Sequence, residues 1–371
     1  MAHVEDLARR SVAVVLGTRP EIVKLAEIVR LLGPAARLVH TGQHYAHELA
    51  RLFLDEFDLP EPDVQLTVGG TSRGQQIAEA TGRLDAHFAA EPPAAVVVQG
   101  DTNTVLAGAL AANARGIALV HVEAGLRSFD RAMPEEHNRV LTDHLADLCL
   151  APTEVNRANL LAEGIADERI AVTGNTVVEA LQRLLPPAAE RQLELASFGL
   201  QAAGFVLATF HRPENVDRPD HLAAILGELG ALPVPVVLPL HPRTAARVRA
   251  FGLEDVLAKL VVTEPLGYRR FLALAAECAA LVSDSGGVQE EASVLKRPVL
   301  VVRNSTERPE VLGTFAELVR PGPDMGRVAG GWLAQLDRLH LRLAEEPGPY
   351  GDGTASARSM AALRQLLARS G

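Results

Sequence analysis

The chain has 371 residues, of which 48% are hydrophobic and 4% aromatic, and its formal net charge is −10. This length exceeds what one hydrophobic core usually organises, so we expect two α/β domains with a cleft between them. The negative charge argues against a protein that binds nucleic-acid backbones without regard to sequence, because such proteins carry a basic stripe.

The cysteines and the N-terminal residues indicate the cellular compartment in which we expect the protein. Cys149 and Cys278 lie far apart within apolar segments, so we expect reduced core thiols. The N-terminal residues contain no apolar signal-like region, and the chain has no run of 18 uninterrupted apolar residues. These features predict a soluble cytoplasmic protein that does not insert into a membrane.

Short β-branched runs alternate with segments of helical period in the first half of the chain. The run SVAVVLGT is followed by a segment whose apolar residues share one helical face, namely Ile22, Leu25, Ala26, Val29 and Leu32. Further runs are ARLVHTG, AAVVVQGDT, IALVHVEAG, LCLAPT and RIAVTGN. Apolar strands separated by helices indicate a parallel sheet covered on both faces, so residues 1–183 should form a Rossmann-like domain.

A Pro- and Ala-rich stretch from Leu184 to Glu190 interrupts this rhythm, which restarts with GFVLATFHR, PVVLPLHPRT, LVVTEPLGY, ALVSDSGG and RPVLVVRN. Residues 184–353 should therefore form a second Rossmann-like domain, and the helical segment 354–371 could pack back on the first. The expected fold class is α/β, with two Rossmann-like domains facing across a cleft and parallel sheets covered by helices. Ligands of such sheets bind beyond the carboxyl ends of the strands.

The motif GTRPEIVK follows the first strand. Arg19 and Lys24 stand near a helix N-terminus, where two cations suit a phosphate, although a solvated helix start explains them equally well. No GxGxxG follows this strand, so a tightly bound nicotinamide dinucleotide is not supported.

Three carboxylates of the first half follow a strand or begin a helix. Asp101 or Thr102 in QGDTNT could simply cap the next helix, whereas Glu123 in HVEAGLR stands among small and apolar residues at the edge of the sheet. Glu135 in PEEHNR begins a helix, where the dipole favours acidic side chains. If the three approach one another, each raises the others' pKa into a range suited to acid/base chemistry near neutral pH.

Histidines and arginines follow two strands of the second half. His211 in FHRPEN and His241 in LHPR each have an arginine nearby, which favours a functional site over a structural histidine. Arg308 in RNSTERPE follows the last strong strand and suits a phosphate. The chain has no HExxH and no cysteine cluster, so a metal site is not favoured, although carboxylates beside a diphosphate could hold Mg²⁺.

The motif SDSGGVQEE reads as a strand, a turn and a helix. Ser285, Gly286 and Gly287 would present bare backbone amides that can approach a diphosphate, and the helix dipole adds to the attraction. Glu291, about one and a half turns further on, could accept hydrogen bonds from both hydroxyls of a ribose.

Together these motifs resemble those of the non-hydrolysing UDP-N-acetylglucosamine 2-epimerases. The chain carries, in the family's order, GTRPEIVK, TGQHY, QGDTNT, HVEAGLRS, MPEEHNR, APTE, GNTV, HRPEN, SDSGGVQEE and NSTERPE. The resemblance implies a GT-B-like pair of domains, a homodimer, a UDP-amino sugar substrate, no nicotinamide and no required metal. It also implies that UDP-N-acetylglucosamine and UDP-N-acetylmannosamine interconvert by anti elimination of UDP to 2-acetamidoglucal, followed by readdition.

The resemblance assigns roles to the candidate residues. It makes Asp101, Glu123 and Glu135 the acid/base carboxylates and His211 a catalytic or leaving-group contact. The implied substrate contacts are Arg19 and Lys24 for the diphosphate or sugar, Ser285, Gly286 and Gly287 for the diphosphate, Glu291 for the ribose, and Phe271 for the uracil through its backbone. His241 and Arg308 complete the predicted substrate-binding set.

Three segments depart from the commonest bacterial pattern. HRPEN replaces HRREN, so one cation is absent and Pro213 stiffens the loop. The segment from Tyr45 to Glu48 and the region from Gly69 to Gln75 also differ, and in many bacterial members these segments help to bind a second, activating UDP-N-acetylglucosamine. Whether this chain has such a site stays open.

Several other functions are compatible with the pattern. Related enzymes epimerise a UDP-2,3-diacetamido uronic acid, or release free N-acetylmannosamine and UDP. A GT-B glycosyltransferase would share the sheets but would leave the three carboxylates without an evident role. A regulator that binds nucleotide sugars would have no need of those carboxylates or of His211.

Overall fold

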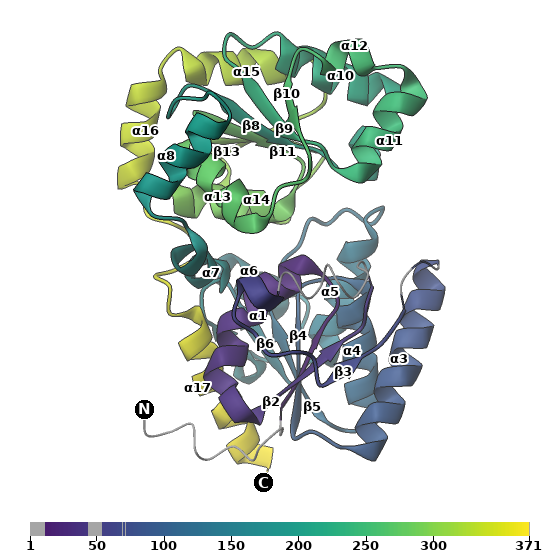
Figure 1. Ribbon diagram of the computed structural model, residues 1–371. Helices are drawn as coiled ribbons and strands as arrows, with labels where there is room; N and C mark the ends of the chain where they lie inside the picture. The colour runs from purple at the N-terminus through teal and green to yellow at the C-terminus, as the bar shows by residue number, and fades with distance from the viewer. Residues whose placement is uncertain (1–11, 44–53, 69, 71, 371) are drawn as a thin grey trace. The chain divides into compact units, whose positions relative to one another are not determined.

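The computed structural model describes residues 12–43, 54–68, 70 and 72–370 (Figure 1). The segment from Tyr45 to Glu48 lies outside the described residues. The chain divides into two compact units. The first domain comprises Met1–Gln182 with Tyr350–Gly371, and the second comprises Arg183–Pro349.

The first domain contains a seven-stranded sheet of order β3-β2-β1-β4-β5-β6-β7, in which every neighbouring pair is parallel. Its strands are β1 (Val12–Leu16), β2 (Ala36–His40), β3 (Val64–Gln65), β4 (Ala95–Gln99), β5 (Ala118–Val122), β6 (Leu148–Ala151) and β7 (Ile170–Val172). Its helices are α1 (Arg19–Leu32), α3 (Arg73–Ala90), α4 (Asn103–Ala114), α5 (Pro134–Leu145), α6 (Glu154–Ala162), α7 (Val177–Leu184, which runs into the second unit) and α17 (Ala355–Ser370).

Helices cover both faces of this sheet. Helix α17 packs against α1, whereas α3 and α4 pack against each other on the opposite face (Figure 1). The five apolar residues expected on one face of α1 are all buried, which confirms that amphipathic pattern. The core is built largely of Ala, Val and Leu, which agrees with an aromatic content of only 4%.

The second domain contains a six-stranded parallel sheet of order β10-β9-β8-β11-β12-β13. Its strands are β8 (Val206–Thr209), β9 (Val236–Pro239), β10 (Val261–Thr263), β11 (Ala280–Ser283), β12 (Val299–Val302) and β13 (Ala316–Val319). Its helices are α8 (Ala188–Ser197), α9 (Pro213–Val216), α10 (Pro219–Gly230), α11 (Pro242–Phe251), α12 (Glu254–Leu257), α13 (Tyr268–Glu277), α14 (Gly286–Leu295), α15 (Asp324–Leu333) and α16 (Leu336–Glu345). Two parallel α/β sheets are the fold class that the sequence predicted.

Each sheet has a point where the strand order reverses. In the first domain this point lies between β1 and β4, and in the second it lies between β8 and β11. At such a point the connections that follow the two neighbouring strands run toward opposite edges of the sheet. The space between these connections, beyond the carboxyl ends of the strands, is where such sheets bind ligands. The motifs GTRPEIVK and QGDTNT follow the first pair of strands, and FHRPEN and SDSGG follow the second pair.

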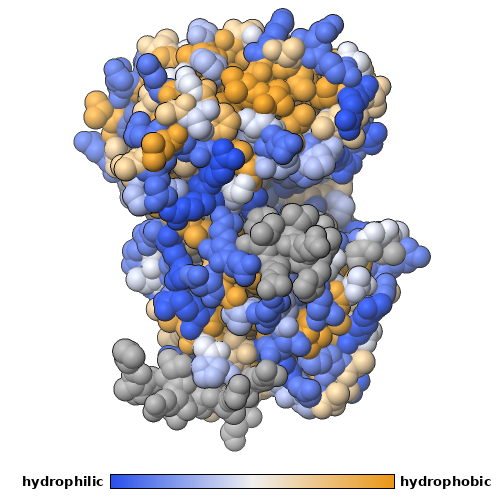
Figure 2. Space-filling view, viewed as in Figure 1, coloured by the Kyte–Doolittle hydropathy of each residue, from blue (hydrophilic) through white to orange (hydrophobic). Residues whose placement is uncertain are grey.

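The burial of the two cysteines agrees with the expectation of reduced core thiols. Cys149 and Cys278 are both free and buried. Figure 2 shows hydrophilic residues over much of the visible face of each domain. In the part of the chain that the structure describes, no helix combines the length and the apolar character needed to cross a membrane.

Candidate functional site

The turn between β1 and α1 is built around a buried carboxyl group that the sequence did not single out. Oε2 of Glu21 accepts hydrogen bonds from the amides of Gly17 (2.5 Å) and Thr18 (2.7 Å), and the Thr102 hydroxyl donates to Oε1. Burial raises the pKa of Glu21 to about 7, although these hydrogen bonds lower it. Glu21 therefore ties the start of α1 to the loop that carries Asp101.

The two predicted cations of α1 differ in their surroundings. Arg19 is the first residue of the helix and is half-buried. Lys24 is buried, and its Nζ forms an ion pair with Oε2 of Glu123. The structure thus brings Lys24 to a predicted acid/base carboxylate, although the two residues are 99 positions apart.

Glu123 follows the last residue of β5 and has a left-handed backbone, with φ of +67°. This conformation costs a residue with a β-carbon about 1–2 kcal/mol, and such strain is concentrated at functional sites. Asn175 also donates to the Glu123 carboxylate, at 3.2 Å. Side chains from two distant segments, Lys24 of α1 and Asn175 after β7, therefore help to fix the orientation of this buried carboxylate.

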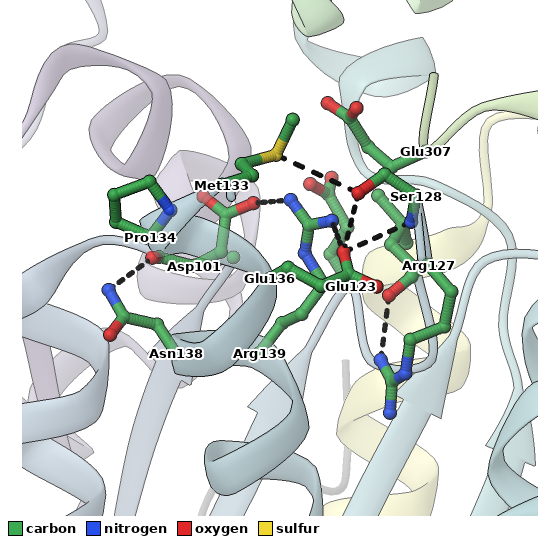
Figure 3. Close-up of polar contacts among 12 residues, drawn as sticks. Asp101, Glu123, Arg127, Ser128, Met133, Pro134, Glu136, Asn138, Arg139 and Glu307 are labelled. Atoms are coloured by element: carbon green, nitrogen blue, oxygen red, sulfur yellow. Dashed lines mark hydrogen bonds and ion pairs between the residues drawn. The ribbon is translucent and has the colours of Figure 1, made fainter. Parts of the chain in front are cut away.

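Asp101 lies at the end of β4 and is held by α5. Arg139 forms an ion pair with Oδ2 of Asp101, and the Asn138 side chain donates to its backbone carbonyl at 2.8 Å (Figure 3). Thr102, not Asp101, caps α4, because its hydroxyl accepts from the Val105 amide. The Asp101 carboxylate is therefore free of the capping role, and its side chain stays 27% exposed.

The two glutamates at the start of α5 have different surroundings. Glu136 is buried and accepts hydrogen bonds from the Ser128 amide (3.0 Å), the Ser128 hydroxyl (2.8 Å) and the Phe129 amide (2.8 Å) (Figure 3). Glu135 is half-buried, and its carboxylate makes no hydrogen bond or ion pair with any residue in the described part of the chain. Glu136 is thus committed to the loop before α5, whereas Glu135 remains available to a substrate.

Sheet pairing brings these carboxylates to one edge. Strands β4 and β5 are neighbours, and Gln99 pairs with Val122, so Asp101 and Glu123 follow adjacent strand ends. Arg139 joins Asp101 to Glu136 and so draws the start of α5, with Glu135, to the same edge. The first domain therefore carries three carboxylates and Lys24 at its switch point.

In the second domain, His211 follows β8 and lies against Asp284 at the end of β11. The buried Asp284 carboxylate accepts from the amides of His211 (3.2 Å) and Arg212 (2.9 Å), and His211 Nδ1 lies 3.3 Å from it. The His241 ring lies 5.6 Å from that of His211, between ring centroids. Partial burial, with Arg212 and other nearby arginines, lowers the pKa of His211 more than Asp284 raises it.

Helix α14 begins at the glycines of SDSGG. A β-carbon on Gly286 would come within 2.6 Å of a Glu307 oxygen and 2.8 Å of an Arg308 nitrogen, so any other residue there would displace these two side chains. A β-carbon on Gly287 would meet only Ser285 Oγ, at 4.0 Å, so space is open on that side of the turn. The first amides of a helix have no partner within it and attract anions.

Arg308 is buried beside this helix start. Its Nε donates to Glu290 at 2.8 Å, and its Nη1 contacts Glu307, which also pairs with Arg303. Arg308 therefore adds positive charge to the turn from a fixed position. The adjacent carboxylates share that charge, so its guanidinium also has a structural role.

The predicted contacts for the nucleoside lie on α13 and α14. Glu291 accepts a hydrogen bond from the Tyr268 hydroxyl at 2.8 Å, and Tyr268, which the sequence analysis did not identify, is buried. Phe271 is buried on α13, and its amide donates to the Gly267 carbonyl within the helix at 3.0 Å. The described residues contain no group of three His, Cys, Asp or Glu side chains placed to hold a metal ion.

Comparison with known proteins places the chain in a family. Residues 33–364 match the family model described as UDP-N-acetylglucosamine 2-epimerase. The UDP-N-acetylglucosamine 2-epimerase of Methanocaldococcus jannaschii is 42% identical over 358 residues, which cover 93% of this chain and 96% of that protein. The UDP-2,3-diacetamido-2,3-dideoxy-D-glucuronate 2-epimerase of Pseudomonas aeruginosa is 35% identical over 362 residues, 95% of this chain and 99% of that one.

A solved structure agrees with this result. The Methanocaldococcus jannaschii UDP-GlcNAc 2-epimerase in complex with UDP-GlcNAc and UDP matches this structure with a TM-score of 0.84 at 38% identity, covering 95% of this chain and 99% of the other. The resemblance seen in the motifs is confirmed over nearly the whole length. The chain belongs to the UDP-N-acetylglucosamine 2-epimerase family of enzymes.

Proposed function

We propose that the chain interconverts UDP-N-acetylglucosamine and UDP-N-acetylmannosamine by eliminating UDP to 2-acetamidoglucal and adding it back. The main support is the group of carboxylates at the switch point of the first domain. Glu123 and Asp101 follow neighbouring strands, each fixed by a cation, and Glu135 begins the helix that holds Asp101. Groups with fixed positions and acid/base chemistry are what removal and return of a C2 proton require.

The order of bond breaking follows from the acidity of the substrate. The C2 proton has no neighbouring carbonyl, so a carboxylate cannot remove it directly. When the C1–O bond to UDP begins to break, C1 gains positive character and the C2 proton becomes acidic. A carboxylate then removes that proton, which gives 2-acetamidoglucal and free UDP. When UDP adds back to C1 and a carboxylate delivers a proton to C2 from the opposite face, the configuration at C2 is inverted.

The departing UDP carries charge that must be stabilised as it forms. In the proposed mechanism the amides at the start of α14, Arg308 and His211 receive this charge, and Glu291 holds the ribose. Loss of one well-placed donor of this kind typically costs about 10²–10³ in rate. Loss of a general base typically costs about 10²–10⁴.

A second candidate substrate is a UDP-2,3-diacetamido uronic acid. It is favoured by the Pseudomonas aeruginosa relative, which covers nearly the same length of this chain at 35% identity. The elimination would be the same for both sugars. The two substrates differ at C3 and C6, so an assay on each separates them.

The test is to incubate the protein with UDP-N-acetylglucosamine in D₂O and to follow the C1 and C2 protons by NMR. Epimerisation predicts the manno product with deuterium at C2. Free UDP with N-acetylmannosamine would instead show hydrolysis. No change with this sugar, together with deuterium incorporation into the diacetamido uronic acid, would replace the proposed substrate by the second candidate. A sigmoidal dependence on substrate concentration would reveal a second, activating site.

A further inference from the structure

One fully buried carboxylate of the first domain has no part in the mechanism above. Asp143 lies on α5, and its Oδ1 is 2.6 Å from Nδ1 of His121. Its Oδ2 accepts from the Gly125 amide at 3.1 Å and lies 2.8 Å from Nη1 of Arg127. His121 in turn donates from Nε2 to the Gly100 carbonyl at 2.8 Å.

These contacts reach the backbone on both sides of the predicted carboxylates. Gly100 directly precedes Asp101, and Gly125 comes two residues after Glu123. Asp143 therefore holds the Glu123 turn directly through the Gly125 amide, and the Asp101 turn indirectly through the His121 ring.

Both turns have left-handed backbone, which glycine adopts without steric cost but which strains Glu123. Gly100, Glu123 and Gly125 have φ of +81°, +67° and +82°. The Gly125 turn is also tightly packed, since a β-carbon there would lie 2.4 Å from the Asn156 carbonyl oxygen. Backbone in such regions persists only where surrounding contacts determine it.

The charge of Asp143 suits this task. Burial raises its pKa, but His121 and Arg127 outweigh burial and hold the pKa below its ordinary value. The carboxylate therefore stays ionised and can accept on both oxygens. Helix α5 also carries Arg139, which pairs with Asp101, so one helix supports both turns.

We infer that Asp143 is a positioning residue that aligns Asp101 and Glu123, directly through Gly125 and indirectly through His121. The inference rests on the proposed function for its catalytic consequence, but its structural consequence can be measured without any substrate. Displacement of a reacting group by about 1 Å costs on the order of 10² in rate. Loss of this alignment should therefore lower kcat much more than it lowers UDP affinity.

The experiment compares three variants of the full chain. Asp143→Ala removes the contact with His121 as well as those with Gly125 and Arg127. Asp143→Asn keeps an acceptor for Gly125 and a polar group facing His121. The control Glu277→Gln weakens a partly buried ion pair of the second domain, in which Arg191 donates to Glu277 at 2.6 Å. Three quantities are measured for each protein, namely kcat in the D₂O assay, the Kd for UDP by calorimetry, and amide hydrogen exchange by mass spectrometry.

We expect Asp143→Ala to lower kcat by about 10²-fold, with the Kd for UDP within about twofold of the original protein and faster amide exchange in residues 99–103 and 122–127. Asp143→Asn should lose less than about tenfold, and Glu277→Gln should leave all three quantities nearly unchanged. The inference is overturned if Asp143→Ala loses no more kcat than Glu277→Gln, or if amide exchange at the two turns is unaltered.

A second variant decides the matter if Asp143→Ala does not fold. His121→Phe keeps an aromatic ring and removes both polar contacts of His121, to Gly100 and to Asp143, while Asp143 keeps its contacts with Gly125 and Arg127. It should speed amide exchange in residues 99–103 and leave residues 123–127 protected by Asp143. An equal change in amide exchange in both segments would refute the inference that Asp143 holds one turn directly and the other through His121. If the unmodified protein incorporates no deuterium at C2 of either UDP sugar, the proposed function fails, whereas the amide measurements still judge the positioning.

Discussion

The buried carboxyl of Glu21 should make the stability of this protein depend on pH in a direction opposite to that of most carboxylates. Its pKa is raised to about 7 in the folded chain from the ordinary value of 4.5, chiefly because it is buried. Between these two values the folded chain binds a proton that the unfolded chain has released. The free energy of unfolding therefore falls as pH rises through this window.

The magnitude follows from the width of the window. Each pH unit between the two pKa values is worth about 1.4 kcal/mol, so ionised Glu21 costs the folded state about 3 kcal/mol above pH 7. Replacement by glutamine should remove this cost. The side-chain carbonyl can still accept from the amides of Gly17 and Thr18, and the new NH₂ group can donate to the Thr102 hydroxyl oxygen.

The assay is urea unfolding of the original protein and of Glu21→Gln from pH 4.5 to pH 8, followed by far-ultraviolet circular dichroism. The variant should gain stability relative to the original protein as pH rises, by about 3 kcal/mol across the range. Glu27→Gln is the control, because Glu27 lies on the same helix and pairs with Arg30 near the surface. Equal pH dependence of the original protein and Glu21→Gln, or a Glu21 carboxyl that titrates near 4.5 by carbon-13 NMR, would refute the reasoning.

Three further predictions concern the candidate site. Glu123→Gln should lower deuterium incorporation at C2 by about 10²–10⁴-fold while the Kd for UDP, measured by calorimetry, stays unchanged; a comparable loss of UDP affinity would contradict an acid/base role. Gly286→Ala should weaken UDP binding because its β-carbon would displace groups 2.6 and 2.8 Å away, whereas Gly227→Ala, which meets no atom within 4 Å, should not; equal affinities would show that the turn can yield. Tyr268→Phe removes the hydroxyl that donates to Glu291, so Glu291 should lose part of its fixed orientation and the Kd for UDP should rise; an unaltered Kd would mean that Glu291 needs no such support.

Much of the fold and the rough location of the site follow from local patterns. The ends of apolar runs determine where strands stop, so Asp101, Glu123 and His211 could be placed at strand ends, and SDSGG at a helix start, before any contact was known. The short strands β3 and β13 were not predicted. Strand β3 has only two residues, and exposed Glu317 interrupts the apolar character of β13.

The partners of the site residues could not be predicted in this way. Lys24 reaches Glu123 across 99 residues, Thr102 rather than Asp101 caps α4, and Glu136 rather than Glu135 is committed to the loop before α5. The first of these outcomes depends on which strand lies beside which, because the order β1-β4-β5 is a property of the whole sheet. The other two are contacts between residues at most eight positions apart, but the motifs alone offered two candidates for each. The sequence by itself determined which residues stand at strand ends, because that depends on a few neighbouring positions. Only the tertiary structure decided which of them pair, because distant segments compete for the same buried groups.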